Sequence, residues 1–327
     1  MTRRLIVLAA LVALLIAAAI AELALGAVKV PPGEVLDILF GSGKPGPNHQ
    51  IVEALRLPRT IEALIVGAAL GVAGAILQGA LANPLASPDV IGVTGGAGFG
   101  AILIIVLFPE KIALLPIGAL VFGLLAAALV FLFAWTGRNR GSIAKVVLAG
   151  IAMLSLFTAG TTGLLAAFPE KAPSAIFFLA GGLTSSGWEN LDTTWPYFLA
   201  GAILVVFLIR PLDRLALGDD VAASLGSRPQ LIRLGAAVAA ALLAAAAAAI
   251  AGLLSFLGLV VPHVVRMAGR TSSQAFVVPA SALGGAALLA GGDTLARTVR
   301  APIELPVGPF MVILGVPVFL WLLRRAL

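Results

Sequence analysis

The chain has 327 residues, of which 61% are hydrophobic and only 11% are charged, and its mean hydropathy is +1.11. Soluble domains carry roughly 25% charged residues, so this composition excludes the ordinary soluble classes. The formal net charge of +6 does not indicate nucleic-acid binding, because the basic residues separate apolar stretches and form no patch. The absence of cysteine excludes disulfides and cysteine metal sites.

Many apolar stretches of the chain approach the ~20 residues that a helix needs to cross a bilayer. They do not show the alternation of apolar and polar residues that is typical of barrel strands. We therefore predict an all-α polytopic membrane protein with one domain over residues 1–327 and about ten transmembrane helices. The predicted spans are 5–25, 60–81, 90–108, 114–135, 143–168, 191–209, 231–253, 256–267, 274–299 and 306–323.

The first apolar stretch could also be a secretory signal. Its apolar core from Leu5 to Ala21 exceeds the roughly 7–15 residues typical of such signals, which favours an uncleaved first span. With the N-terminus cytoplasmic, most of the 21 lysines and arginines lie on the inner side, and an even number of spans places both termini there. Arg56, Arg59, Arg297 and Arg300 breach this rule, because they sit at outer ends of the second and ninth spans.

Ionisable side chains inside spans are candidates for function, and this chain has few of them. Glu62 follows Arg59 by three residues, and Arg297 follows Asp293 by four, so two local ion pairs are expected. Ion-driven carriers typically have carboxylates at the midplane beside broken helices, and Asp293 belongs nearer the outer end. An ion-coupled secondary carrier is therefore the weaker alternative.

The motifs of several enzyme classes are missing from the sequence. The segment GSGKPG at 41–46 lacks the spacing of a Walker A loop, and the glycines of 96–100 follow no predicted strand. His49 and His263 are far apart with no carboxylate cluster, so no metal centre is expected. We predict that this chain is not an enzyme and binds no cofactor.

The longest cytoplasmic segment, 210–229, is organised as two short helices. The first is expected over 211–217 and ends at Gly218. The second begins at Asp219 or Asp220, whose charge suits a helix N-terminus, and ends at Gly226. An apolar ridge would be formed by Leu215, Leu217, Val221 and Leu225. This segment either rests on the floor of the bundle or docks a cytoplasmic partner.

Several segments together resemble the permease subunits of ATP-binding-cassette (ABC) importers for iron-siderophore, haem and cobalamin, the type II importer class. The similarity lies in the order and spacing of four stretches, from about residue 56 to the C-terminus. They are RLPRTIEALIVGAALGVAGAILQGALANPLASPDVIGVTGGAGFGA (56–101), LDRLALGDDVAASLG (212–226), GLVVPHVVRMAGR (258–270) and DTLARTVRAPIELPVGPFMVILGVPVFLWLL (293–323).

This resemblance implies a role for each of these features. Segment 210–229 would be the coupling-helix loop, with the ATPase contacted by Leu212, Leu215, Leu217, Gly218, Asp219, Asp220, Leu225 and Gly226. Asn83 and Leu85, together with Gly141 and Ser142, would form cytoplasmic gates. Arg56, Arg59 and Arg297 would grip acidic residues of a periplasmic or lipid-anchored binding protein, which would explain why they breach the topology rule.

The stretch LANPLASPDVIGVTGGAGFG (81–100) suits such a gate physically. Pro84 and Pro88 end helices, Asn83 can cap a helix end, and the glycines let backbones meet closely. A fixed charge at a gate would hold an anionic or metal-bearing chelate and slow its release. The stretch is nearly uncharged, which is consistent with a translocation pathway that does not bind its cargo tightly.

The resemblance further implies a homodimer in a prokaryotic cytoplasmic (inner) membrane, with the pathway on its two-fold axis. Two ATPase subunits would carry the ATP and Mg²⁺ below, and one binding protein would dock above. Iron-siderophore is the favoured cargo, with haem, cobalamin and oxyanions as alternatives that the sequence does not separate. A structural membrane scaffold is the remaining alternative from another class.

Overall fold

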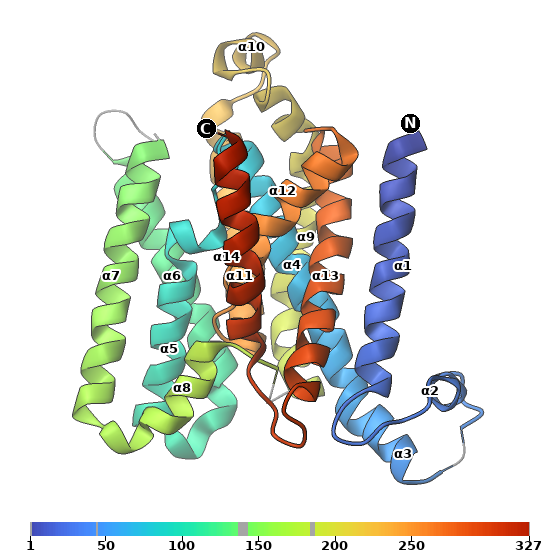
Figure 1. Cartoon of the computed structure of the whole chain (residues 1–327). Coiled ribbons are helices and arrows are strands. Elements are labelled where there is room, and N and C mark those ends of the chain that lie inside the picture. Colours follow the sequence, from blue (N-terminus) through green and yellow to red (C-terminus); the bar gives the residue numbers. More distant parts are fainter. Residues whose placement is uncertain (1, 44, 137–142, 184–186, 327) are drawn as a thin grey trace.

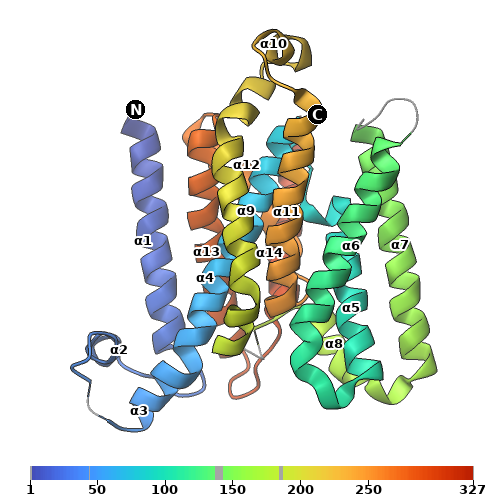
Figure 2. The same ribbon diagram turned by 180° about the vertical axis from the view of Figure 1, so that it is seen from behind.

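The computed structural model describes residues 2–43, 45–136, 143–183 and 187–326 (Figure 1). Their regular elements are all helical, and the long helices stand side by side in one bundle (Figure 2). Each of the ten predicted spans coincides with one helix. These helices are α1 (Thr2–Ala24), α4 (Leu57–Ala80), α5 (Val93–Leu107), α6 (Leu115–Trp135), α7 (Ile143–Ala167), α9 (Trp188–Leu215), α11 (Pro229–Ala251), α12 (Leu257–Gly269), α13 (Gln274–Thr298) and α14 (Val307–Ala326).

Short helices connect these long ones. The connections at one end of the bundle, which is the predicted outer end, hold α2 (Pro32–Leu39), α3 (Pro47–Gln50), the π-helix Ile51–Arg56, the 3-10 helices Pro109–Leu114 and Pro169–Lys171, and α8 (Ala172–Ala180). The opposite end holds the 3-10 helix Pro88–Ile91 between α4 and α5, and α10 (Asp219–Ser224) between α9 and α11. Both termini lie at the same end of the bundle as α10 (Figure 1).

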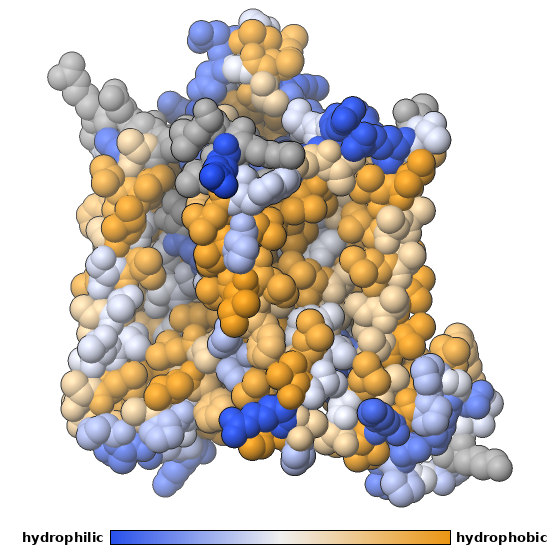
Figure 3. Space-filling model, viewed as in Figure 1, coloured by the Kyte–Doolittle hydropathy of each residue, from blue (hydrophilic) through white to orange (hydrophobic). Residues whose placement is uncertain are grey.

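Seven helical segments in the described residues are long and apolar enough to cross a membrane, and α5, α12 and α14 form shorter apolar helices. A broad hydrophobic belt lies between hydrophilic ends (Figure 3). The chain is therefore an all-helical, multi-pass membrane protein. The short helix α12 packs against α4, α13 and α14, so most of its residues face protein and not lipid, as expected for a span of this length.

The centre of the bundle is built from small residues. The alanine-rich helix α11 is mostly buried, whereas α1 at the edge is largely exposed. A methyl group added at Gly74 of α4 would overlap the carbonyl oxygen of Gly258 in α12. Glycine at this position is what allows the two backbones to touch, as is usual for tightly packed membrane helices.

Candidate translocation cavity, gate and coupling elements

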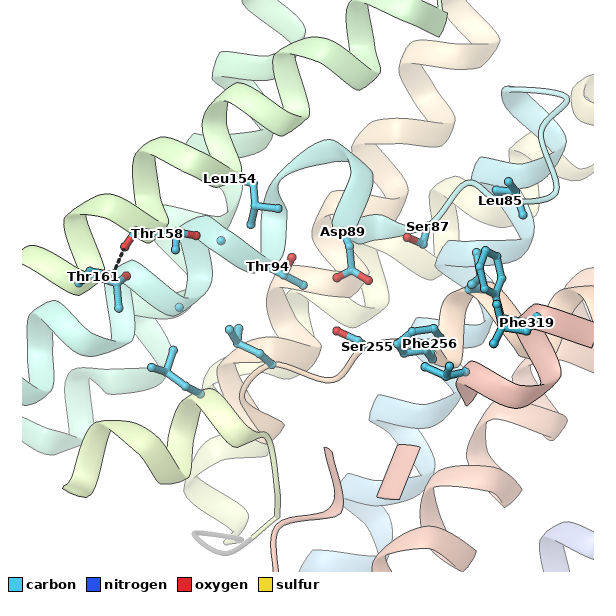
Figure 4. A pocket seen from close by; sticks show the side chains of 18 of the residues that line it. Leu85, Ser87, Asp89, Thr94, Leu154, Thr158, Thr161, Ser255, Phe256 and Phe319 are labelled. Atoms are coloured by element: carbon cyan, nitrogen blue, oxygen red, sulfur yellow. Dashed lines mark hydrogen bonds between the residues drawn. The ribbon is translucent and has the colours of Figure 1, made fainter. Parts of the chain in front are cut away.

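A cavity of about 840 Å³ opens between α5, α7, α14 and the segment 253–256 (Figure 4). Its lining is mainly apolar, with leucine and phenylalanine side chains and a minority of serines and threonines. Leu85 and Ser87 of the turn between α4 and α5 also line it. The predicted gate stretch therefore borders a space large enough for a drug-sized molecule.

Asn83 shapes this turn and Leu85 faces the cavity. The Asn83 side-chain oxygen accepts a hydrogen bond from the Leu85 backbone N–H at 2.9 Å, so the amide stabilises the chain just after α4 ends. Leu85 is 40% exposed, which leaves its side chain available to meet another surface. The other predicted gate residues, Gly141 and Ser142, lie outside the described residues.

Asp89 is a cavity-lining residue that sequence reasoning did not assign. It lies in the 3-10 helix Pro88–Ile91, where its carboxylate points toward Ser255 across the cavity (Figure 4). Burial raises its pKa to about 6, while the hydroxyl groups of Thr94 and Ser87 partly offset this effect. The sequence offered one signal for this residue, because Asp89 is the single charged residue of the stretch 81–100.

The coupling loop differs from its prediction at the first helix. Residues 211–215 continue α9 through Pro211, and no separate helix begins there. Leu212 and Leu215 are buried against the bundle, and this packing holds the helix together where proline removes a backbone hydrogen bond. Leu215 is therefore not part of an exposed ridge, which corrects that expectation.

The second helix of the loop forms as predicted. Asp219 and Asp220 make the first turn of α10, after Gly218 with its φ of +100°. Leu217, Val221 and Leu225 remain 60%, 46% and 54% exposed. We call Val221 of α10 and the two side chains that flank this helix, Leu217 and Leu225, the α10 ridge. Exposed apolar side chains grouped in this way are typical of a contact surface for another protein.

Arg233 of α11 connects α10 to the end of α4. The turn that follows α4, residues 81–87, is called the gate turn because it holds Asn83 and Leu85. Its guanidinium donates to both Asp219 carboxylate oxygens at 2.9 and 2.8 Å, and its Nε donates to the Ala80 carbonyl at 3.1 Å. Ala80 is the last residue of α4, three residues before Asn83. No spacing signal in the sequence indicates this link, because its partners are far apart along the chain.

A second contact fixes the other side of the loop. The Asp213 carboxylate accepts from the backbone N–H of Gln274 at 2.6 Å and from the Ser273 hydroxyl at 3.3 Å. A carboxylate at this position accepts from the free N–H of the first residue of α13 and suits the positive end of the helix dipole. Hydrogen bonds therefore connect the segment 210–229 and its neighbour Arg233 to both α4 and α13.

The predicted docking arginines are buried at the end of the bundle opposite α10, which is the predicted outer end (Figure 1). Arg56, Arg59 and Arg297 are only 5%, 7% and 4% exposed. Arg59 contacts the Asp293 carboxylate at 2.8 and 3.1 Å and Glu304 at 2.6 Å. This finding corrects the expected local pair of Arg59 with Glu62.

Glu62 instead accepts hydrogen bonds from the backbone of Gly187 at 3.1 Å and from Asn190 at 3.4 Å. The expected pair of Asp293 with Arg297 is present at 3.2 Å. Arg297 also donates to the Glu22 backbone carbonyl at 2.9 Å.

Arg56 donates to the backbone carbonyls of Leu23, at 2.7 Å, and Val28. In the chain by itself, all three predicted docking arginines therefore hold helices and connections together. Their docking role stays a prediction.

A helical multi-pass membrane bundle with a cavity beside the predicted gate stretch, and with a short exposed helix at one end, is the architecture expected of a transport permease. The FecCD transport family matches residues 14–325, and the chain belongs to this family. It is 35% identical over 326 residues to the Fe(3+)-citrate import system permease protein YfmE of Bacillus subtilis (strain 168), covering 98% of this chain and 96% of that one.

Other similar proteins include the hemin transport system permease protein HmuU of Yersinia pestis. The two are 37% identical over 278 residues, which are 83% of this chain and 82% of HmuU. A solved inward-facing structure of a metal-chelate type ABC transporter superposes with a TM-score of 0.84 at 30% identity, covering 98% of this chain and 99% of that one. The chain is thus a permease subunit of the type II ABC importer class.

Proposed function

We propose that this chain is the translocation subunit of an ATP-driven importer that moves an iron chelate, most simply a siderophore complex, into the cell. The observation that carries this proposal is the connection from α10 through Arg233 to the gate turn beside the cavity. A displacement of the α10 ridge would be transmitted through Asp219 and Arg233 to Ala80, the last residue of α4. Movement of the ATPase would then change the position of the gate turn beside the cavity.

The proposed complex contains two copies of this chain, which is a single domain over residues 1–327 with ten spans. The pathway lies between the copies, and Leu85 of each copy closes it from the inner side. Two ATPase subunits hold ATP and Mg²⁺ and engage residues 210–229, while this chain binds no cofactor and hydrolyses nothing. The position of both termini and α10 at one end of the bundle supports placing them in the cytoplasm (Figure 1).

The proposed location is the cytoplasmic (inner) membrane of a prokaryote, where lipid surrounds the apolar belt. One periplasmic or lipid-anchored binding protein would deliver the cargo to the outer end. Direct docking through Arg56, Arg59 and Arg297 would require these side chains to exchange the internal partners that they have in the single chain. The alternative is that they shape the outer end, and that exposed neighbours make the contact.

The relatives are named for different chelates, namely ferric citrate for YfmE, ferric enterobactin for FepG of Escherichia coli (strain K12) and hemin for HmuU. Their identities to this chain lie between 35% and 37%, so overall similarity does not choose among these cargoes. We therefore keep haem and cobalamin as alternative cargoes of the same class. An ion-coupled carrier remains the alternative from another class.

Uptake of radiolabelled ferric chelates by cells tests this function. A strain that lacks the chain should lose uptake of its chelate and recover it with the wild-type chain. The variant Leu217→Asp, which changes only the exposed α10 ridge, should reach the membrane and yet fail to restore uptake. Unchanged uptake in the strain that lacks the chain would contradict the proposal, and full recovery with the variant would contradict the role of the ridge.

A further inference from the structure

Asp89 has the one ionisable side chain among the described residues that line the cavity. The rest of the lining is apolar or carries hydroxyl groups, as for Thr158 and Ser255 (Figure 4). A charge beside low-dielectric walls acts on a molecule in the cavity with little screening by water. An unneutralised carboxylate therefore makes the cavity sensitive to the charge of what passes through it.

The position of Asp89 strengthens this argument. It lies four residues after Leu85, and its carboxylate faces Ser255 between Leu85 on one side of the cavity and Thr158 on the other (Figure 4). Within the described part of the chain, hydroxyl groups of Thr94 and Ser87 act on the carboxylate, and no basic side chain offsets its charge there. The pKa of about 6 leaves the group largely ionised above neutral pH.

We propose that the Asp89 carboxylate is a charge filter, which favours chelates with a cationic or hydrogen-bond-donating outer face and disfavours chelates with an anionic one. This inference rests on the proposed function and narrows its cargo to cationic or neutral chelates of the hydroxamate type. Catecholate and citrate complexes, and haem with its propionates, would be disfavoured. The alternative role for Asp89 is purely structural, as an acceptor that holds the turn before α5.

Asp89→Asn separates the two roles, because asparagine keeps an acceptor oxygen for the hydroxyl groups of Thr94 and Ser87 but removes the charge. The chain contains no cysteine, so a single cysteine can report on the cavity. Ser255→Cys places a thiol opposite Asp89 (Figure 4). In purified permease at pH 8 and low salt, the reporter is modified with a trimethylammonium and with a sulfonate methanethiosulfonate, and the ratio of the two rates is measured.

We expect the ratio of cationic to anionic modification at Ser255→Cys to fall about tenfold when Asp89→Asn is added, corresponding to about 1.4 kcal/mol. Phe40→Cys, 83% exposed in an outer connection, is the matched control and should keep its ratio. An unchanged ratio at Ser255→Cys after Asp89→Asn is added would overturn the charge filter. The charge filter would also be overturned if neither reagent modified the Ser255→Cys thiol. This measurement needs no ATPase, no binding protein and no transport.

Uptake supplies the second measurement. A ferric trihydroxamate with a terminal ammonium is compared with the same chelate after succinylation of that amine, which reverses the charge and keeps the iron centre. Asp89→Asn should raise uptake of the anionic chelate relative to the cationic one by about tenfold. An equal change for both chelates would overturn the filter while leaving the importer intact. Absence of import of any chelate by the wild-type complex would instead contradict the proposed function.

Discussion

Replacing Arg59 with glutamine tests whether the outer arginines belong to the fold or are free for a partner. Arg59 contributes two contacts to Asp293, which is completely buried, and one to Glu304. Removing one partner of a buried ion pair lowers the free energy of unfolding by about 3–5 kcal/mol, because the remaining charge stays buried without its partner. Since Asp293 keeps Arg297 at 3.2 Å, we expect the lower end, about 3 kcal/mol.

The free energy of unfolding is measured in mixed detergent micelles, on purified permease without any other protein. Arg300→Gln is the matched control, because Arg300 is exposed at the same end of the bundle and should change the free energy by about 0.5 kcal/mol or less. If Arg59→Gln were as stable as wild type to within about 1 kcal/mol, the ion cluster would contribute little to the fold. The arginine would then be free to serve as a docking residue.

Three further predictions concern the packing of α4 on α12, the contact between Asp219 and Arg233, and the α10 ridge. Gly74→Ala should lower the free energy of unfolding by about 1–3 kcal/mol because its methyl group would overlap the facing backbone, whereas Gly163→Ala has open space and should cost almost nothing. Asp219→Arg should uncouple ATP hydrolysis from uptake, and adding Arg233→Asp should partly restore it, since the exchange rebuilds the pair but not the contact to α4. Leu217→Asp should abolish binding of the ATPase in a pull-down without changing the melting temperature.

The sequence predicted the helices well, because each span is a long apolar stretch whose ends are marked by proline, glycine or charge. The second coupling helix was predicted for the same kind of reason: Gly218, Asp219 and Gly226 mark its ends locally. The first coupling helix was not, because the burial of Leu212 and Leu215 outweighs the local effect of Pro211.

Partners that are distant in the chain could not be predicted. The Arg59–Glu62 pair was expected from spacing alone, but folding brings Asp293 and Glu304 to Arg59 across more than 230 positions. The contact of Arg233 with Ala80 spans 153 positions and has the same origin. The orientation of Asp89 toward the cavity likewise depends on how the turn after α4 folds, which composition does not determine.

Uptake by lipid vesicles tests most directly whether an external ATPase drives this permease. Vesicles are prepared with the permease, its ATPase and its binding protein, and matched vesicles lack only the ATPase. With ATP supplied on the ATPase side, the complete vesicles should accumulate labelled ferric chelate against its concentration difference, and those without the ATPase should not. Accumulation of the chelate by vesicles without the ATPase, driven by a proton or sodium gradient, would contradict the account.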